Sequence, residues 1–257
     1  MRRLKDRLKN SSFYPLLKSL NELRVKCLLT QKKKRELAKA HKLLHDNELF
    51  YTLSPDLLLA IAKSFKIQRN DLLQNHGYYE FGIFKGFSLW FAEKLSREYC
   101  NKDFKLYGFD SFEGLAKSSV DIDDIYWAEG NYACSYQAVS NNLKNYGTDL
   151  SRIKMFKGWF SKDLFDSLRD RESFHPCSIC VIDSDIYEAR VEVLDFMRGI
   201  MVSGTILLFD DFNAFNKDDR HGERRALLEF EKANHTFQKE YLFDFGWHGV
   251  AFRVIAI

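Results

Sequence analysis

Six short apolar runs between residues 78 and 255 alternate with longer segments in which apolar residues recur every three or four positions. Runs of four to six residues suit strands that are buried on both faces, and the longer segments have the spacing of amphipathic helices. This alternation predicts an α/β domain with a doubly wound, mostly parallel sheet. The expected strands are Tyr78–Phe81, Phe104–Phe109, Ile153–Phe156, Ile179–Ile182, Thr205–Phe209 and Val250–Ile255. The expected helices are Ser88–Tyr99, Tyr136–Tyr146, Ser161–Leu168, Glu188–Met201 and Glu223–Asn234.

The N-terminal segment follows a different pattern. Apolar residues recur at helical spacing from Phe13 to Leu28, and a second helical segment covers Lys32 to Leu44. We therefore predict a basic helical N-terminal arm, residues 1–50, ahead of an α/β domain, residues 51–257. Two interpretations of the arm stay open. It packs on the domain or on a second subunit of a homo-oligomer, or it makes a peripheral contact with an anionic membrane surface.

Charge is distributed unevenly along the chain. Residues 1–45 hold fourteen Lys and Arg against three Asp and Glu, a net charge of +11 that leaves −8 for the rest of a chain whose total is +3. Because the positive charge is confined to the arm, we expect no nucleic-acid partner for the domain. The charged opening of the chain lacks the apolar stretch of an export signal, and the odd number of cysteines suits reduced thiols. A cytoplasmic enzyme is expected, with membrane association through the arm as the alternative.

Ligands of doubly wound sheets bind beyond the carboxyl ends of the strands, so the residues after each run are informative. The first run ends at Glu80, and Gly82 and Gly86 frame a turn into a helix, where glycine lets the backbone approach a ligand closely. The second run ends at Asp110, where an acidic residue can accept hydrogen bonds from both ribose hydroxyls of an adenosine-containing ligand. The alternative role of Asp110 is to cap the following helix. Together the two strand ends favour a cofactor site.

Two pairs of aspartates follow consecutive strands. Asp183 and Asp185 come after the fourth run, and Asp210 and Asp211 after the fifth. Four carboxylates at one site repel one another unless some are protonated or a cation neutralises them. Mg²⁺, which prefers oxygen ligands, satisfies this requirement with two or three carboxylates. The alternative is that Asp185 and Asp211 cap helices, but two pairs at neighbouring strand ends favour the metal.

The sequence at these strand ends resembles the class I S-adenosylmethionine-dependent methyltransferases, and within them the macrocin-type sugar O-methyltransferases. This resemblance implies a seven-stranded Rossmann-like sheet, S-adenosylmethionine and Mg²⁺ as cofactors, and methyl transfer to a sugar hydroxyl of a glycoside, natural product or saccharide. The arm has no counterpart in the family pattern. The motifs that carry the resemblance are "EFGIFKG", "YGFDSFEGL", "EGNYACSYQAVSNNL", "FKGWF", "IDSDIYE", "ILLFDDF" and "GERRALLEF", in family order over residues 78 to about 230.

The resemblance also assigns roles to residues. Asp185 is implied as the general base that takes the proton of the sugar hydroxyl, whose acidity a metal would increase. The implied contacts are Glu80, Gly82 and Gly86 for the methionine part of the cofactor, Asp110 and Ser111 for the ribose, Gly158 and Trp159 for the neighbourhood of the adenine, and Asp183, Asp210 and Asp211 for Mg²⁺. The sequence departs from the family pattern at Phe87, where a second glycine is usual, and at Ala116, where a proline is usual.

The sequence also allows two other functions, a glycosyltransferase and a non-catalytic subunit. "DSD" also matches the Asp-x-Asp of a metal-dependent nucleotide-sugar glycosyltransferase, which leaves the glycine turn, Asp110 and the second aspartate pair without a role. A non-catalytic methyltransferase-like subunit for assembly or membrane docking would use the basic arm. His221 and His248 follow elements that can face the acceptor, and we treat them as candidate substrate contacts.

Overall fold

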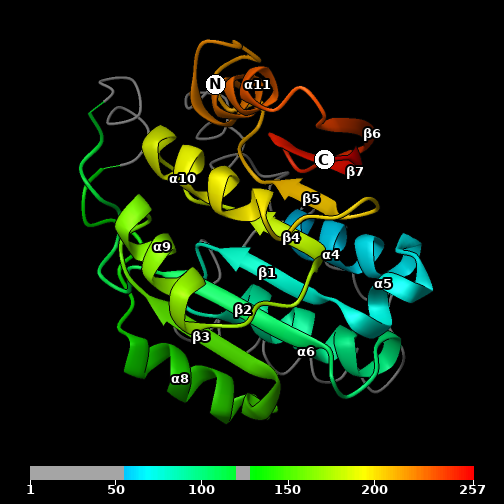
Figure 1. The fold of residues 1–257 in the computed structure, drawn as a ribbon. Helices are drawn as coiled ribbons and strands as arrows, with labels where there is room; N and C mark the ends of the chain where they lie inside the picture. The colour runs from blue at the N-terminus through cyan, green and yellow to red at the C-terminus, as the bar shows by residue number, and fades with distance from the viewer. Residues whose placement is uncertain (1–54, 120–127) are drawn as a thin grey trace, which may run out of the picture.

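A computed structural model describes residues 55–119 and 128–257, so the predicted arm and its helices lie outside the described residues. Within these ranges seven strands form one sheet in the order β3-β2-β1-β4-β5-β7-β6 (Figure 1). The strands are β1 Gly77–Phe81, β2 Lys105–Asp110, β3 Ile153–Lys157, β4 Cys177–Ile182, β5 Ile206–Phe209, β6 Gln238–Phe245 and β7 Gly249–Ala256. The helices are α4 Pro55–Ile67, α5 Asn70–Asn75, α6 Phe87–Tyr99, α8 Tyr136–Asn145, α9 Lys162–Arg171, α10 Tyr187–Arg198 and α11 Gly222–Ala233, with a 3₁₀ turn η2 at Leu150–Arg152.

The strand order places a topological switch between β1 and β4. β1 pairs in parallel with β2 on one side and with β4 on the other, and only β7 runs against its neighbours β5 and β6. Consecutive helices therefore cover opposite faces of the sheet on the two sides of this switch, and ligands of such sheets bind at the carboxyl ends of the strands there. The predicted fold class is confirmed, and all six predicted strands lie within two residues of their observed bounds.

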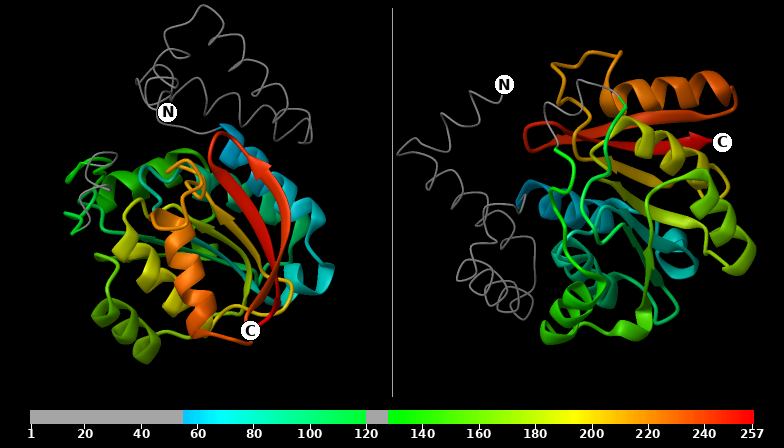
Figure 2. Two further views of the ribbon diagram at one scale, coloured as in Figure 1. Left: turned by 90° about the horizontal axis from the view of Figure 1, so that it is seen from above. Right: turned by 90° about the vertical axis from the view of Figure 1, so that its left-hand side faces the viewer.

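Successive residues of each strand enter two different hydrophobic cores. Tyr78 and Leu106 pack with α4, α6 and α8, whereas the adjacent Tyr79 and Tyr107 pack with α9, α10 and α11. Figure 2 shows the sheet between these two helical layers. Because the strands are buried on both faces, they appear in the sequence as continuous apolar runs and not as alternating apolar and polar residues.

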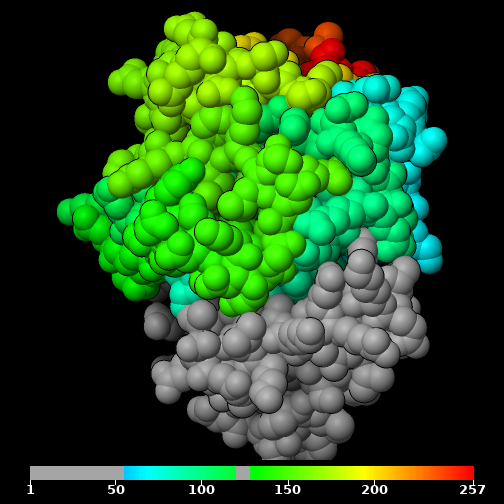
Figure 3. All heavy atoms as spheres, turned by 90° about the horizontal axis from the view of Figure 1, so that it is seen from below, coloured from blue at the N-terminus to red at the C-terminus, as the bar shows by residue number. Residues whose placement is uncertain are grey.

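Helices α6 and α8 lie side by side on one surface (Figure 3). The indole N–H of Trp90 donates to the carbonyl of Tyr146 over 3.1 Å, and the Lys94 ammonium donates to the carbonyl of Gly147 over 2.6 Å. These contacts fix the end of α8 against α6. The helix that begins after the glycine turn is thereby held in place from outside the sheet.

Three elements were not predicted from the sequence. β6 is the edge strand, and mainly Phe243 and Phe245 of its residues are buried, so its apolar signal is weak. α4 and α5 precede β1, and α4 buries most of its circumference against α6 and the sheet, which blurs its amphipathic pattern. None of the helices in the two described ranges has both the length and the apolar character needed to span a bilayer.

Candidate active site

Strained backbone is concentrated at the carboxyl edge of the sheet. In the described chain, every non-glycine residue with positive φ lies in a loop that follows β1, β2, β4 or β5. Residues other than glycine rarely adopt a backbone conformation with positive φ. Such a conformation persists where the surrounding structure enforces it, which is common at functional sites. The residues are Phe84, Phe112, Tyr132, Asp185, Asn216 and Lys217, with φ between 45° and 64°.

The glycine turn joins two parts of this edge. Gly82 has φ +89°, and a Cβ there would lie 1.9 Å from the carbonyl oxygen of Asp183. Gly86 has φ +82°, and a Cβ there would lie 2.9 Å from Val139 Cγ1. Both predicted glycines are therefore required by the packing of the turn, Gly82 against the end of β4 and Gly86 against α8.

Glu80 lies at the end of β1 with its carboxyl group fully buried. Its Oε2 accepts a hydrogen bond of 2.6 Å from the Tyr78 hydroxyl, and its Oε1 accepts one from the Ser88 hydroxyl. Burial raises the pKa of Glu80 to about 7 and outweighs these two hydrogen bonds, which lower it. Glu80 can therefore change its charge near neutral pH at the point where β1 meets the glycine turn.

Asp110 binds the backbone of two loops. Its Oδ2 accepts the N–H groups of Ile83 and Phe84, each at 2.9 Å, and its Oδ1 accepts that of Phe112 at 2.7 Å. Burial raises the pKa of Asp110 despite these bonds. A carboxylate offers about four acceptor positions, so three backbone contacts leave room for a ligand hydroxyl. The next residue, Ser111, uses its hydroxyl within its own turn and donates to the Gly114 carbonyl over 2.7 Å.

The loop after β3 reaches the same place. The N–H of Gly158 donates to the backbone carbonyl of Asp110 over 2.9 Å, and the Trp159 side chain that follows is 42% exposed. The residues predicted near the adenine thus adjoin the residue predicted at the ribose. Whether they contact a nucleoside remains a prediction.

The aspartates at the ends of β4 and β5 converge as the sequence predicted. Asp183, Asp185 and Asp211 each have a carboxylate oxygen, and these three atoms lie within 4.8 Å of one another. Backbone hydrogen bonds hold the strand ends together, from the N–H of Asp183 to the Phe81 carbonyl at 2.9 Å and from that of Asp210 to the Ile182 carbonyl at 3.2 Å. Two of the three predicted metal residues, Asp183 and Asp211, therefore form one cluster with the predicted base, Asp185.

Burial raises the pKa values of Asp183 and Asp185 well above their usual range. For Asp183 the next largest cause is the charge of Asp210, and for Asp185 it is the charge of Asp211. Asp210 is not one of the three residues whose oxygens meet within 4.8 Å, so it acts on the cluster as a neighbouring charge. The family resemblance assigned Asp210 to the metal and Asp185 to proton transfer. In the structure it is Asp185, not Asp210, whose carboxylate oxygen lies close to those of Asp183 and Asp211.

Two buried charged residues, Arg190 and Glu223, support the cluster and were not singled out from the sequence. Arg190 Nε lies 3.6 Å from Glu223 Oε1, and Glu223 Oε2 accepts the backbone N–H of Asp211 at 3.0 Å. The only signal was for Glu223, which lies in the "GERRALLEF" segment, whereas Arg190 lies two residues beyond "IDSDIYE".

Tyr132 also faces the cluster. Its ring contacts Phe84 of the glycine turn edge to face, with ring centroids 5.6 Å apart. Partial burial, and after it the charges of Asp185 and Asp183, raise the pKa of Tyr132 to about 12. Its phenol is therefore a hydrogen-bond donor beside the carboxylates. No residue-level signal distinguishes Tyr132 within the "EGNYACSYQAVSNNL" segment.

Both candidate histidines lie at the carboxyl edge. His221 precedes α11, and its Nε2 is 3.8 Å from a carboxylate oxygen of Asp218. His248 is in the turn between β6 and β7, where its carbonyl accepts the N–H of Asn213 at 2.9 Å. His248 is thereby linked to a residue two positions beyond Asp211. Contact of either histidine with a substrate remains a prediction.

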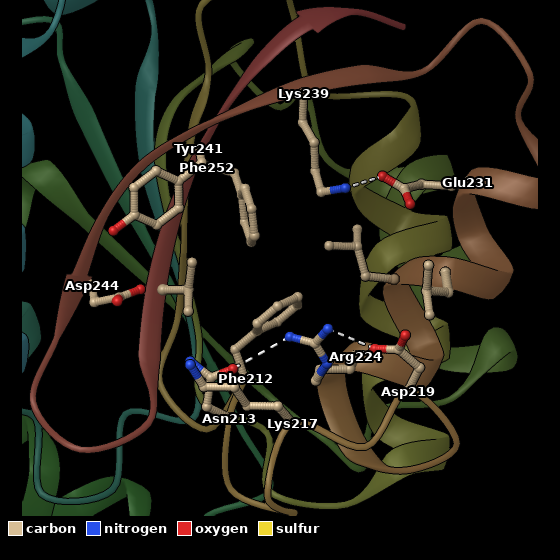
Figure 4. Close-up of a pocket in the computed structure, with 13 residues that line it drawn as sticks. Phe212, Asn213, Lys217, Asp219, Arg224, Glu231, Lys239, Tyr241, Asp244 and Phe252 are labelled. Atoms are coloured by element: carbon tan, nitrogen blue, oxygen red, sulfur yellow. Dashed lines mark hydrogen bonds and ion pairs between the residues drawn. The ribbon is translucent and has the colours of Figure 1, made fainter.

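A pocket of 440 Å³ opens between α11 and the strands β6 and β7 (Figure 4). The buried side chains of Val250 and Phe252 and the partly buried side chain of Phe212 form part of its lining, and Tyr241, which is 58% exposed, lies at its edge. Because Phe212 directly follows Asp211, the pocket begins next to the aspartate cluster.

The polar lining of this pocket is balanced in charge. Arg224 donates to Asn213 over 3.3 Å and forms an ion pair of 2.6 Å with Asp219, as Figure 4 shows. Lys239 pairs with Glu231 on the opposite side. Lys217 and Asp244 complete a set of three basic and three acidic side chains. The lining therefore combines apolar side chains with charged side chains whose charges sum to zero. Such a lining suits a neutral ligand with hydroxyl groups.

Comparisons with known proteins identify the family of this chain. A family model described as Macrocin-O-methyltransferase (TylF) matches residues 70–254. The mycinamicin III 3''-O-methyltransferase of Micromonospora griseorubida is 25% identical over 169 residues, which are 60% of this chain and 64% of that protein. The chain thus spans less than two thirds of the length of this curated relative.

Solved structures share the fold. The O-methyltransferase NovP matches with a TM-score of 0.65 and 18% identity, over 79% of this chain and 81% of that one. The calicheamicin methyltransferase CalS11 matches with a TM-score of 0.64 and 19% identity, over 91% of each chain. Because the family match includes the glycine turn, Asp110 and both aspartate pairs, this chain belongs to the macrocin O-methyltransferase family.

Proposed function

We propose that this protein transfers the methyl group of S-adenosylmethionine to a sugar hydroxyl of a glycoside, natural product or saccharide, with Mg²⁺ as a second cofactor. The observation that carries the proposal is the cluster of Asp183, Asp185 and Asp211 beside the glycine turn. Family membership supplies the reaction class. The name of the curated relative, a 3''-O-methyltransferase of mycinamicin III, supports an acceptor of the sugar type.

The strand ends fit S-adenosylmethionine in charge and in donor type. Its amino acid part carries an ammonium group, and its sulfur is a sulfonium cation, so the Glu80 carboxylate suits this end of the molecule. Asp110 has acceptor capacity left for a ribose hydroxyl, with Ser111 next to it. Gly158 and Trp159 adjoin Asp110 and would flank the adenine. Gly82 and Gly86 keep the turn close to the cofactor.

The aspartates also fit Mg²⁺. Three converging carboxylates give the oxygen donors that this ion prefers. Burial, and after it the charges of neighbouring carboxylates, raises the pKa values of Asp183 and Asp185, and a cation would relieve this repulsion. Asp183 and Asp211, with Asp210 beside them, would hold the ion. When bound, Mg²⁺ would orient two neighbouring sugar hydroxyls and increase the acidity of the one that reacts.

The protein's own residues would then carry out the remaining tasks. Asp185 accepts the proton of the acceptor hydroxyl through its carboxylate, and the hydroxyl oxygen attacks the methyl carbon as S-adenosylhomocysteine leaves. Holding the oxygen in line with the methyl group lowers the barrier by itself. Tyr132, whose ring contacts Phe84 of the glycine turn, would donate a hydrogen bond beside the cluster.

The pocket between α11 and β6 would receive the part of the acceptor beyond the reacting sugar. It starts at Phe212 and Asn213, next to the cluster, and its balanced charges favour an uncharged glycoside over a phosphorylated sugar. His248, linked to Asn213, and His221 at the start of α11 would flank this region.

The direct test is methyl transfer from labelled S-adenosylmethionine to a panel of monosaccharides, nucleotide sugars and glycosylated natural products, with and without Mg²⁺. We expect transfer to a sugar hydroxyl that requires Mg²⁺ and is abolished by EDTA. Transfer that is equal with and without the ion would reject the metal, and transfer to no sugar in the panel would reject the acceptor class.

Two broader proposals concern the setting of the enzyme. We keep a cytoplasmic location and a homo-oligomeric state as proposals, and peripheral membrane contact through residues 1–50 as the alternative role of the arm. The glycosyltransferase interpretation of "DSD" is not favoured, because the family match covers the glycine turn and the second aspartate pair that it leaves without a role. A non-catalytic role is likewise not favoured, because the site residues are present.

A further inference from the structure

Arg190 and Glu223 form a charged pair in the interior of the protein. Their side chains are 1% and 0% exposed, and Arg190 Nε lies 3.6 Å from Glu223 Oε1. Such a pair seldom stabilises a fold more than apolar side chains of similar size would, because both charges lose their hydration. A role other than stability is therefore the better explanation for its place beneath the aspartates.

The pair connects two helices to the end of β5. Arg190 lies in the first turn of α10, and Glu223 in the first turn of α11. Glu223 Oε2 accepts the backbone N–H of Asp211 at 3.0 Å, so its carboxylate fixes the start of the loop that presents the Asp211 side chain.

The neighbouring backbone is shaped around the guanidinium group. Gly222 has φ +55°, and a Cβ there would lie 3.2 Å from Arg190 Nη1 and 2.6 Å from the Phe215 ring. A larger residue at this position would push the guanidinium away from the start of α11. The position of Arg190 next to Glu223 is thus built into the loop before α11.

We propose that Glu223 is a positioning residue for the Mg²⁺ site, which holds the Asp211 backbone in place and is itself held by Arg190. This inference rests on the proposed function, because it assumes that Asp211 binds the ion. Residues that orient metal ligands in this way typically change metal affinity or activity about 10- to 100-fold when they are replaced.

The test compares two double variants of the full chain that differ in one hydrogen-bond acceptor. Arg190→Met with Glu223→Gln removes both charges but keeps an amide oxygen that can accept from the N–H of Asp211. Arg190→Met with Glu223→Leu removes the charges and the acceptor. Mg²⁺ affinity is measured by titration calorimetry in the presence of S-adenosylhomocysteine, and folding by the thermal unfolding midpoint.

We expect both double variants to unfold near the wild-type temperature, since the charged pair is replaced by side chains of similar size. The Leu variant should bind Mg²⁺ roughly 10- to 100-fold more weakly than wild type, and the Gln variant should recover most of this loss. Equal Mg²⁺ affinity in the two variants would overturn the inference while leaving the proposed metal site intact. Absence of Mg²⁺ binding by the wild type would overturn the metal site and the inference together.

If the Leu variant does not fold, two single variants with smaller changes test the positioning role of Glu223. Glu223→Asp keeps the charge but shortens the side chain, so that it cannot reach both Arg190 and the N–H of Asp211. The matched control is Glu229→Asp, in the exposed pair of Glu229 with Arg225 on the same helix. We expect weaker Mg²⁺ binding, roughly tenfold, for Glu223→Asp alone. Wild-type affinity in Glu223→Asp would overturn the inference.

Discussion

Asp185 combines two unfavourable features in one residue. Its backbone has φ +59°, which costs of the order of 1–3 kcal/mol for a residue other than glycine, and its half-buried carboxyl group lies among other carboxyl groups. The left-handed backbone fixes the direction in which the side chain leaves the chain. A strained residue with a perturbed acid at a strand end is the pattern expected of a proton acceptor.

Asp185→Asn should reduce kcat by roughly 100- to 10,000-fold, because the amide cannot accept the proton of the acceptor hydroxyl. Asparagine tolerates a left-handed backbone, so the loop should keep its shape. S-adenosylhomocysteine affinity should be unchanged, and Asp195→Asn on the exposed face of α10 is the control. Near-normal turnover would reject the base. A parallel loss of Mg²⁺ affinity would instead make Asp185 a metal ligand.

Glu80 gives a prediction for pH dependence. Because burial raises its folded-state pKa from 4.5 to about 7, its contribution to stability is complete below about pH 4.5 and is lost as the pH rises through 7. The loss amounts to about 3 kcal/mol in the free energy of unfolding. Glu80→Gln has no such titration, so the variant should gain stability relative to wild type between pH 5 and pH 8 in urea denaturation. A difference between the two proteins that stays constant with pH would contradict the assignment.

The site residues that were predicted from the sequence all lie at the ends of buried strands. Gly82, Asp110 and the aspartates of β4 and β5 directly follow buried runs, so locating the strands located them. Arg190, Glu223 and Tyr132 lie within helices or a long loop, where nothing in the local pattern distinguishes a buried or site-facing side chain from a surface one. Their roles follow from contacts between segments far apart in the sequence.

At the scale of elements, the strands with two buried faces were the predictable part. β4 is buried at all six positions and appears as an unbroken apolar run. β6 exposes most of its residues at the sheet edge, and its Gln238, Lys239 and Glu240 resemble a polar loop in the sequence. The pocket beside β6 could not be predicted for the same reason, because one of its two walls was not predicted to exist.

That pocket yields a prediction about the acceptor. Tyr241→Ala should raise the KM for the sugar acceptor identified in the transfer screen by roughly tenfold, the loss of about 1.4 kcal/mol of aromatic contact. The kcat value and the affinity for S-adenosylhomocysteine should not change, because Tyr241 lies away from the cluster. Ile255→Ala, an exposed position on β7 outside the pocket, is the matched control. An acceptor KM equal to that of wild type would exclude Tyr241 from the acceptor site.

For the molecule as a whole, the aspartate cluster couples stability to pH and, under the proposed function, to Mg²⁺. The raised pKa values of Asp183 and Asp185 mean that their contribution to stability is present at low pH and is lost as the pH rises and they are forced to ionise. A bound cation would offset the loss of stability that ionisation of these carboxyl groups causes. Mg²⁺ would also displace the protons that the carboxyl groups hold.

Mg²⁺ should therefore raise the thermal unfolding midpoint more at pH 8 than at pH 6, and EDTA should remove the gain. At an ion concentration 100 times the Kd, binding to the folded state alone adds about 2.7 kcal/mol. Calorimetry in buffers of different ionisation enthalpy should detect proton release on binding. Replacing both Asp210 and Asp211 by Asn is the control that should abolish the response. A midpoint shift that is the same at both pH values would argue against carboxylates that are protonated before the ion binds.

The placement of β1 between β2 and β4 has a consequence for synthesis of the chain. Tyr78 pairs with Leu106 on one side and with Ile179 on the other, so one edge of β1 waits about a hundred residues for its partner. At ordinary ribosomal speeds this delay is roughly 5–20 s, during which an apolar strand edge is open to chaperones or to other chains. The carboxylates of β4 and β5 emerge only at the end of it. The nascent protein therefore contains the glycine turn and Asp110 before it contains the aspartates whose charges repel one another.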